Sequence, residues 1–314
     1  MKAIKKHQIM TIIVVHYVAI FFACVYSSPS FFSKNTSFSE PELTPIVSPE
    51  NDPFFHISLD AKSVYVFDAA TGKVLFAKNE EAQLPLASVT KVMTALVASS
   101  LSDGTVVNVT KEDLDGGNGG LSLGEKWNLK NLLDYTLVVS SNSGASVIAG
   151  AAGAVIPKKE GEKNEEAFVR EMNLTAKKLG MTQTFYLNPS GLDTDENLAG
   201  SYGSAKDMAI LFDAILETKP RLLDSTAYDS LSFTSLNGVS HNAVNTNTIV
   251  RTIPGLVASK TGYTDLANGN LVIAFNAGPM NPVIIAVLGS SQEGRFSDVE
   301  KLVMASLKKI GQGE

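Results

Sequence analysis

The sequence contains a single cysteine, Cys24, and four histidines. One cysteine can neither close an intrachain disulfide nor build a zinc site of cysteine ligands, and neither an HExxH pattern nor an EF-hand loop occurs. Only His241 lies well inside the chain, since His7, His16 and His56 belong to its N-terminal part. We therefore expect no metal and no cofactor, and a histidine-based mechanism would depend on His241 alone.

An excess of positive charge is also missing. The chain has 26 lysines and arginines against 32 aspartates and glutamates, which gives a formal net charge of -6. Because clustered cations are needed to hold a phosphate backbone, this balance argues against nucleic acid as a partner. Hydrophobic residues make up 44% of the 314 residues, which is enough to bury a sizeable core.

Charged residues are absent from residues 9–26, which follow Lys2, Lys5 and Lys6. An uncharged run behind basic residues is typical of an export signal or a membrane anchor, and the lysines keep its N-terminal end in the cytoplasm. We expect residues 1–26 to form that segment, with an uncleaved anchor slightly favoured. The rest of the chain is then expected at the outer face of the cytoplasmic membrane, either anchored or secreted.

Residues 27–53 are rich in serine and proline, a composition that favours extended backbone over a packed core. We interpret them as a tether, followed by one catalytic domain over residues 54–314. No second linker of this kind and no internal repeat occur in that part of the sequence. Because the sequence stops after one amphipathic helix, we expect the N-terminal segment to be the only anchor.

Strand-like segments open and close the folded part. Apolar residues on either side of Thr71 and Gly72 predict a hairpin. Further strands are predicted at 256–261, 271–275 and 283–288. Apolar residues at helical spacing predict helices from Ser88 and over 129–139, 143–152, 165–179, 205–216 and 298–310.

This order predicts an α/β or α+β fold rather than a doubly wound one. Its sheet is mainly antiparallel and built from both chain ends, with flanking helices and an inserted helical region. Ser204, with Asp207 three residues further on, is expected to form a capping box for the helix that starts at 205.

A hydroxyl and an amine three residues apart form the first chemical motif. Ser88 and Lys91 share a face at a predicted helix start, so a lysine with a lowered pKa can act as the base for a serine nucleophile there. Alone the pattern is weak, because Ser306 and Lys309 repeat it in the last predicted helix, where we interpret it as a solvated face.

Two further motifs follow in a fixed order. Ser140 and Asn142 stand at the end of a predicted apolar helix, and Lys260, Thr261 and Gly262 lie on a predicted strand. The series SxxK, SxN and KTG is the set found in serine penicillin-binding proteins and class A β-lactamases. Their coincidence in this order indicates a catalytic serine far more strongly than any one of them.

At these residues the chain resembles the D-alanyl-D-alanine carboxypeptidases among the low-molecular-mass penicillin-binding proteins, which share a β-lactamase/transpeptidase-like fold. The likeness runs from about Ala61 to the end of the chain. Residues 68–75 are similar to the family's opening hairpin and 86–94 to its nucleophile segment. Residues 188–193 and 205–209 are similar to the stretch between its SxN and KTG motifs.

The resemblance implies that Ser88 attacks the bond between two terminal D-alanines and forms an acyl-enzyme. Lys91 would take the serine proton, and Asn142 would position Lys91 and the substrate amide. Ser140 and Lys260 would relay a proton to the leaving amine. Which group is the base is disputed in this superfamily.

Substrate contacts are implied in the same way for the third motif. Lys260 and Thr261 would hold the substrate carboxylate, and the backbone amides of Ser88 and Tyr263 would form the oxyanion hole. Gly262 belongs to the same substrate-binding segment. The implied partners are peptidoglycan stem peptides and, as covalent inhibitors, β-lactam antibiotics.

The sequence departs from the family pattern at several positions. Ser143 and Gly144 replace a usual Asp-Ala pair, which alters the support of the asparagine before them. Thr246 stands where some relatives carry an arginine near the substrate carboxylate, and Arg251 is a candidate to substitute for it. Asn268 replaces a usual glycine, so we expect a different turn there.

Other hypotheses remain open. Residues 120–124 match the GxSxG pattern, and Ser122 with His241 would follow the chain order of an α/β-hydrolase. That motif needs a strand before it and a helix after it, whereas here it follows a glycine-rich loop. A non-catalytic cell-wall-binding protein of the same fold is a second alternative.

A serine β-lactamase is the alternative within the enzyme class. Class A β-lactamases release the acyl group with a glutamate acting through water, and no matching ExxLN segment lies between SxN and KTG. We interpret Asp193, Asp195 and Glu196, which are bracketed by glycines, as loop carboxylates in solvent.

Overall fold

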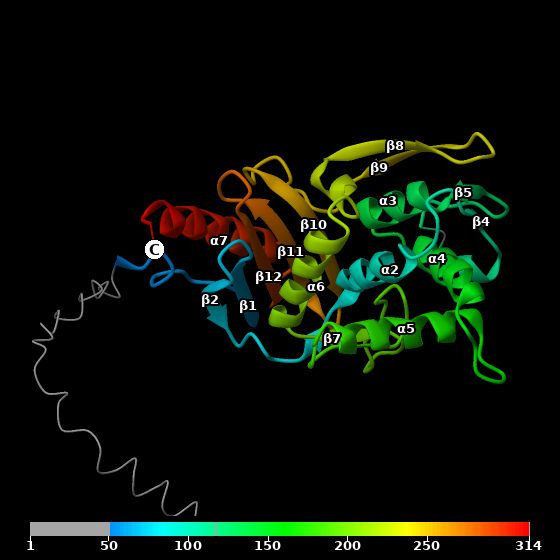
Figure 1. Cartoon of the computed structure of the whole chain (residues 1–314), viewed down its shortest axis with the longest axis horizontal. Helices are drawn as coiled ribbons and strands as arrows, with labels where there is room; N and C mark the ends of the chain where they lie inside the picture. The colour runs from blue at the N-terminus through cyan, green and yellow to red at the C-terminus, as the bar shows by residue number, and fades with distance from the viewer. Residues whose placement is uncertain (1–50, 116, 118, 314) are drawn as a thin grey trace, which may run out of the picture. The chain divides into compact units, whose positions relative to one another are not determined.

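The computed structural model describes residues 51–115, 117 and 119–313 of the chain, which Figure 1 shows in colour. The predicted anchor at 1–26 and the predicted tether up to residue 50 lie outside the described residues and stay predictions. Within the described part, no helix combines the length and the apolarity that crossing a membrane requires.

Both ends of the described chain contribute strands to one antiparallel sheet (Figure 1). In the described residues this sheet has the order β10-β11-β12-β1-β2. Its strands are β1 (Ser63–Asp68), β2 (Lys73–Lys78), β10 (Leu256–Thr264), β11 (Asn268–Asn276) and β12 (Pro282–Ser290). The predicted hairpin is present, and Gly72 turns it with a φ of +71°. The predicted fold class is confirmed.

Both faces of the sheet are covered, as the central strand β12 illustrates. Its residues alternate between two hydrophobic clusters, with Val283, Ile285 and Val287 in one and Ile284 and Ala286 in the other. The first cluster packs against α7 (Gly294–Gly311), and the second faces α6 (Ala205–Thr218). Because both faces are buried, β12 is apolar without interruption from 283 to 288 rather than alternating with polar residues.

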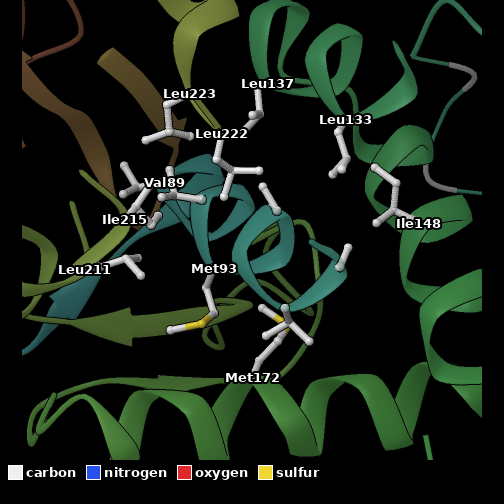
Figure 2. Close-up of a cluster of buried hydrophobic side chains, with 14 of the residues drawn as sticks. Val89, Met93, Leu133, Leu137, Ile148, Met172, Leu211, Ile215, Leu222 and Leu223 are labelled. Carbon is white, nitrogen blue, oxygen red and sulfur yellow. The ribbon is translucent and has the colours of Figure 1, made fainter. Parts of the chain in front are cut away.

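A short helix, α2 (Lys91–Ala98), runs through the middle of the helical region. It packs against α6 and against three further helices, α3 (Leu129–Val139), α4 (Asn142–Val155) and α5 (Asn164–Lys178). Figure 2 shows the apolar side chains that surround it, with Ile148 on α4 and Met172 on α5 on two sides of Met93. The 3-10 turn η2 (Ala87–Thr90) enters α2 and is fixed by this packing.

The remaining described elements are short. They are β3 (Leu84–Pro85), β4 (Val106–Asn108), η3 (Glu112–Leu114), β5 (Lys126–Asn128), β6 (Phe185–Tyr186), β7 (Ser201–Gly203), η4 (Asp224–Ala227), β8 (Ser230–Thr234) and β9 (Ser240–Val244). β8 and β9 form a hairpin that packs on α3. The sequence analysis predicted none of these strands.

Two local expectations need correction. The last helix begins at Gly294, four residues before its predicted start, because the amide of Gly294 is held by Ser291 Oγ at 2.9 Å. Ser204 caps α6 as predicted, with its Oγ accepting from the Asp207 amide at 3.1 Å. The carboxylate of Asp207 does not complete the capping box, since it accepts from Gln183 and Thr184 instead.

Candidate active site

Ser88 lies in η2, half-buried, immediately before α2. The residue before it, Ala87, has a φ of +49°, in the left-handed region that alanine adopts only under strain. The Oγ1 of Thr90 donates to the Ala87 carbonyl oxygen at 2.7 Å, and Gly191 packs so closely on that carbonyl that a Cβ there would lie 1.9 Å from its oxygen. These contacts fix a backbone that presents the Ser88 hydroxyl at a helix start.

The side chain of Lys91, one turn further on, points at Ser88. Its Nζ lies 2.9 Å from Ser88 Oγ and 2.8 Å from Asn142 Oδ1. It also donates to the carbonyl oxygen of Ser190 at 2.7 Å. Among the described residues, Lys91 forms no ion pair with a carboxylate. A neutral amine has two N-H donors, which the two carbonyl oxygens can use, and this leaves its lone pair for the Ser88 hydroxyl.

Ser140 and Lys260 form a second hydrogen-bonded pair, with 2.9 Å between Oγ and Nζ. Ser140 ends α3 with a φ of +61°, and this reversal places the next residue, Ser141, as the N-cap of α4. Asn142 then opens α4 and reaches Lys91. The SxN motif therefore connects two helices and contacts both lysines, one through each of its functional side chains.

The segment that carries Thr261 and Gly262 is the end of β10, an edge strand of the sheet. A Cβ on Gly262 would lie 2.7 Å from the Leu86 carbonyl oxygen and 3.2 Å from the Ser88 amide nitrogen. Only glycine allows this approach of strand to nucleophile turn. Tyr263 follows with an exposed side chain, so all the predicted site residues belong to segments that the fold brings together.

Burial perturbs both lysines. Desolvation, followed by the positive charge of Lys260, holds the pKa of Lys91 well below its usual value of 10.5. Desolvation, followed by the charge of Arg295, lowers the pKa of Lys260 to about 7. In both cases low dielectric and a neighbouring cation disfavour the ammonium form. The site is therefore suited to move protons near neutral pH.

Two contacts of the site were not anticipated from the sequence. Ser190 contributes its backbone carbonyl to Lys91, held by a loop in which Asn188 Oδ1 accepts from the amides of Ser190 and Gly191 at 3.2 and 2.7 Å. Arg295, at the start of α7, donates to the Gly262 carbonyl oxygen at 2.8 Å. A main-chain ligand leaves no signal in sequence, and Arg295 lies 33 residues from its partner.

Near the KTG motif, the departures from the family pattern take definite forms. Thr246 Oγ1 lies 2.5 Å from Thr261 Oγ1, so a hydroxyl pair replaces a cation there. Arg251 does not take over, because its exposed guanidinium pairs with Asp229. Asn268 has a φ of +55°, the left-handed conformation that asparagine tolerates, so the expectation of a different turn has no support.

Around the SxN motif, Ser143 Oγ donates to the carbonyl oxygen of Gly117. Gly144 packs on Thr136, where a Cβ would lie 2.1 Å from Oγ1. The helix α4 therefore approaches α3 more closely than an alanine at 144 would permit.

The acidic loop residues divide into two groups. Asp193 is half-buried and accepts from Thr264 Oγ1 at 3.0 Å, so its assignment to solvent is wrong. Asp195 and Glu196 are exposed, as expected. The half-buried aspartate thus anchors its loop to the end of β10.

The GxSxG motif is not assembled as a nucleophile elbow. Ser122 is exposed in the loop between η3 and β5, and no strand directly precedes it. The imidazole of His241 instead contacts the buried Glu125, with 2.9 Å between Nε2 and Oε1. The other oxygen of Glu125 accepts from the Ser122 amide at 3.0 Å and from Trp127 Nε1 at 3.4 Å. The motif is a structural support rather than a second active site.

The described residues include no group of three or more histidine, cysteine or acidic side chains that could hold a metal ion. The chemistry of the site rests on hydroxyls, amines and backbone amides.

Comparison with known proteins places this geometry in context. A family model described as D-alanyl-D-alanine carboxypeptidase matches residues 47–292. The chain is 29% identical over 252 residues to the D-alanyl-D-alanine carboxypeptidase DacF of Bacillus subtilis, covering 78% of this chain and 61% of DacF. It is 31% identical over 237 residues to DacB2 of Mycobacterium tuberculosis, covering 74% of this chain and 77% of DacB2.

Among solved structures, the chain is similar to penicillin-binding protein D2 of Listeria monocytogenes in its ampicillin-bound form. The TM-score is 0.67 at 28% sequence identity, and the match covers 79% of this chain and 98% of that one. The chain thus spans nearly the whole of the Listeria structure, but only about three fifths of the length of DacF.

Proposed function

Since the chain belongs to the D-alanyl-D-alanine carboxypeptidase family, we propose that it is a serine D-alanyl-D-alanine carboxypeptidase that removes the terminal D-alanine from peptidoglycan stem peptides. The observation that carries the proposal is the placement of Lys91 Nζ between Ser88 Oγ and two carbonyl oxygens, with no carboxylate partner among the described residues. This arrangement favours a neutral amine beside a serine hydroxyl, which is what nucleophilic attack by serine requires.

In the acylation step, Lys91 accepts the Ser88 proton while Ser88 Oγ attacks the carbonyl carbon of the penultimate D-alanine. The amides of Ser88 and Tyr263 donate to the oxyanion that develops. Ser140, in contact with Lys260, delivers a proton to the leaving nitrogen, and the C-N bond breaks to release D-alanine. Water then cleaves the Ser88 ester, which frees the shortened peptide and restores the serine hydroxyl.

The substrate carboxylate is expected at the end of β10. Lys260 supplies charge there, and Thr261 supplies a hydroxyl that Thr246 orients. Because the pKa of Lys260 is only about 7, its charge is partly lost above neutral pH, so hydroxyl donors carry more of the recognition as the pH rises.

β-Lactams are proposed to acylate the same serine, and the Listeria relative is known in an ampicillin-bound form. The predicted segment 1–26 supports export of the domain and attachment to the membrane. Protease added to intact cells or spheroplasts should digest the domain if this topology is right. Protection that persists after the envelope is opened would contradict it.

A direct test incubates the purified full-length chain with a peptide that ends in D-Ala-D-Ala and follows the loss of one alanine by mass spectrometry. Labelled penicillin should add one adduct to the peptide that contains Ser88. An adduct that persists in Ser88→Ala would contradict the assignment of the nucleophile. Binding of penicillin without peptide turnover would indicate a non-catalytic wall-binding protein.

Timed mass spectra separate the carboxypeptidase from a β-lactamase, because both make an ester on Ser88. Among the described residues, no carboxylate pairs with Lys91, so the structure offers no base beside the ester of the kind that class A β-lactamases use. We expect slow release of the penicilloyl group and faster hydrolysis of the peptide ester, whose departed D-alanine vacates space for water. Rapid multiple turnover of penicillin would replace the assignment by a β-lactamase.

A further inference from the structure

Arg295 is a buried cation next to the candidate site. Its side chain lies in the first turn of α7, and the residue is only 8% exposed. Its Nη1 donates to the carbonyl oxygen of Gly262 at 2.8 Å, and its guanidinium lies 4.7 Å from the centre of the Phe296 ring. In the part of the chain that the structure describes, Arg295 Nε has no hydrogen-bond partner.

Stability does not account for this arginine. A buried guanidinium normally pairs with a carboxylate, and Arg295 forms no such ion pair among the described residues. Burial lowers the pKa of its guanidinium, so the fold works against this charge. A methionine would fill similar space without a cost of desolvation, which makes the single strong contact with Gly262 the feature that needs an explanation.

The contacted carbonyl belongs to the peptide group that joins Gly262 and Tyr263. No cis peptide bond occurs in the described chain, so the carbonyl of Gly262 and the amide of Tyr263 point in opposite directions across one plane. Arg295 therefore holds the far side of the peptide whose N-H is the second donor of the proposed oxyanion hole. The Ser88 amide, the first donor, lies 3.2 Å from the position that a Cβ on Gly262 would take.

We propose that Arg295 is a positioning residue that orients and polarises the Gly262–Tyr263 peptide, so that its N-H stabilises the negative oxygen formed on acylation of Ser88. The inference rests on the proposed serine carboxypeptidase function and adds to it a residue that touches no substrate. A charged donor on a carbonyl oxygen draws electrons through the amide, which makes the N-H on the other side a stronger donor.

The effect is specific to the transition state. The substrate carbonyl carries little charge before attack, whereas the tetrahedral intermediate carries a full one. Strengthening the Tyr263 amide therefore lowers the barrier to acylation more than it tightens binding of the substrate. The charge of Arg295 also contributes to the lowered pKa of Lys260, so one residue supports both sides of the site.

Three variants separate the contributions of Arg295. Arg295→Met removes both donor and charge, Arg295→Gln keeps an N-H donor without the charge, and Arg295→Lys keeps the charge on a single nitrogen. Arg221→Met is the matched control, because that exposed arginine pairs only with Asp224. Thermal unfolding of each full-length variant establishes that it is folded before its kinetics are compared.

The first measurement is the rate constant of acylation by a labelled penicillin, determined separately from the constant for non-covalent binding. We expect acylation to slow about tenfold or more in Arg295→Met, since a donor is weakened rather than removed, while non-covalent binding changes by less than about threefold. Arg295→Gln and Arg295→Lys should fall between it and the unaltered chain. Loss of binding with an unchanged acylation rate constant would overturn the proposal.

The second measurement is the infrared carbonyl band of the acyl ester on Ser88, made with a ¹³C-labelled β-lactam. Hydrogen bonds from the oxyanion hole lower its frequency, so the band in Arg295→Met should move toward that of the denatured acyl-enzyme. An unshifted band in a folded variant that acylates at the unaltered rate would overturn the role of Arg295. Failure of the unaltered chain to acylate at all would instead contradict the proposed function on which the inference rests.

Discussion

The cluster around Lys91 and Lys260 and the pair formed by Glu125 and His241 are both buried, but only the second joins an acid to a base. In the first, each ammonium nitrogen contacts only hydroxyl and carbonyl oxygens. In the second, the two oxygens of Glu125 accept from an imidazole, a backbone amide and an indole. The two regions have similar polarity and opposite electrostatics.

The difference separates reactivity from stability. Uncompensated amines in low dielectric lose their protons easily, which suits proton transfer and lowers the stability of the fold. A carboxylate with a donor at each oxygen leaves no polar group unsatisfied and stabilises the segments that it joins. Removing a lysine should therefore reduce activity and spare the fold, whereas removing the glutamate should do the reverse.

The largest expected effect is on activity. Lys91→Ala removes the proposed base, so acylation by labelled penicillin should slow about 10³-fold or more. The fold should survive, because the change also removes a desolvated amine. Circular dichroism and thermal unfolding would provide the control, and a variant that acylates at the normal rate would show that another group takes the serine proton.

The opposite substitution tests the other region. Glu125→Ala leaves the donors of His241, Trp127 and Ser122 unpaired, which should lower the free energy of unfolding by about 3 kcal/mol. Glu125→Gln keeps an acceptor for the loop amide and should cost less. Urea unfolding measures both, and a change below about 0.5 kcal/mol in Glu125→Ala would remove the contrast between the two regions.

The third prediction concerns pH and stability. Between its folded-state pKa of about 7 and its usual value of 10.5, Lys260 is neutral in the fold and charged in the unfolded chain. Unfolding takes up a proton in this window, so this lysine lowers stability as the pH falls from 10.5 to 7 and adds no further change below 7.

Lys260→Met should therefore stabilise the fold by about 1–2 kcal/mol at pH 6, after the lost contacts with Ser140 and Thr261 are discounted, and by almost nothing above pH 10. Unfolding curves at both pH values provide the measurement. An equal effect at the two values would mean that the lysine keeps its proton in the fold.

Local patterns account for what the sequence revealed. The helix over 129–139 was predicted with the bounds that the structure has, because its apolar residues recur at helical spacing between clear end signals. The SxxK and KTG residues were likewise placed on a helix start and a strand. In each case the information lies within a few residues of the site.

One missed element did have a local signal. Asn237 and Gly238 separate two short alternating segments, a pattern that strongly favours a hairpin, and Gly238 turns with a φ of +84° between β8 and β9. The contacts of Ser190 and Arg295 had none. They depend on how a loop and α7 pack against the sheet, which no local pattern encodes.

The smallest expected effect sharpens the comparison from within the Glu125 region. Ser122 touches Glu125 only through its backbone amide, and its side chain is exposed. Alanine keeps that amide, so Ser122→Ala should change the free energy of unfolding by less than about 0.5 kcal/mol and leave peptidase and esterase rates unaltered. Ser88→Ala serves as the inactive reference in both assays. A dead Ser122→Ala variant would restore the α/β-hydrolase hypothesis and assign His241 to catalysis, whereas a silent one leaves the loop as a main-chain support whose anchor is the carboxylate of Glu125.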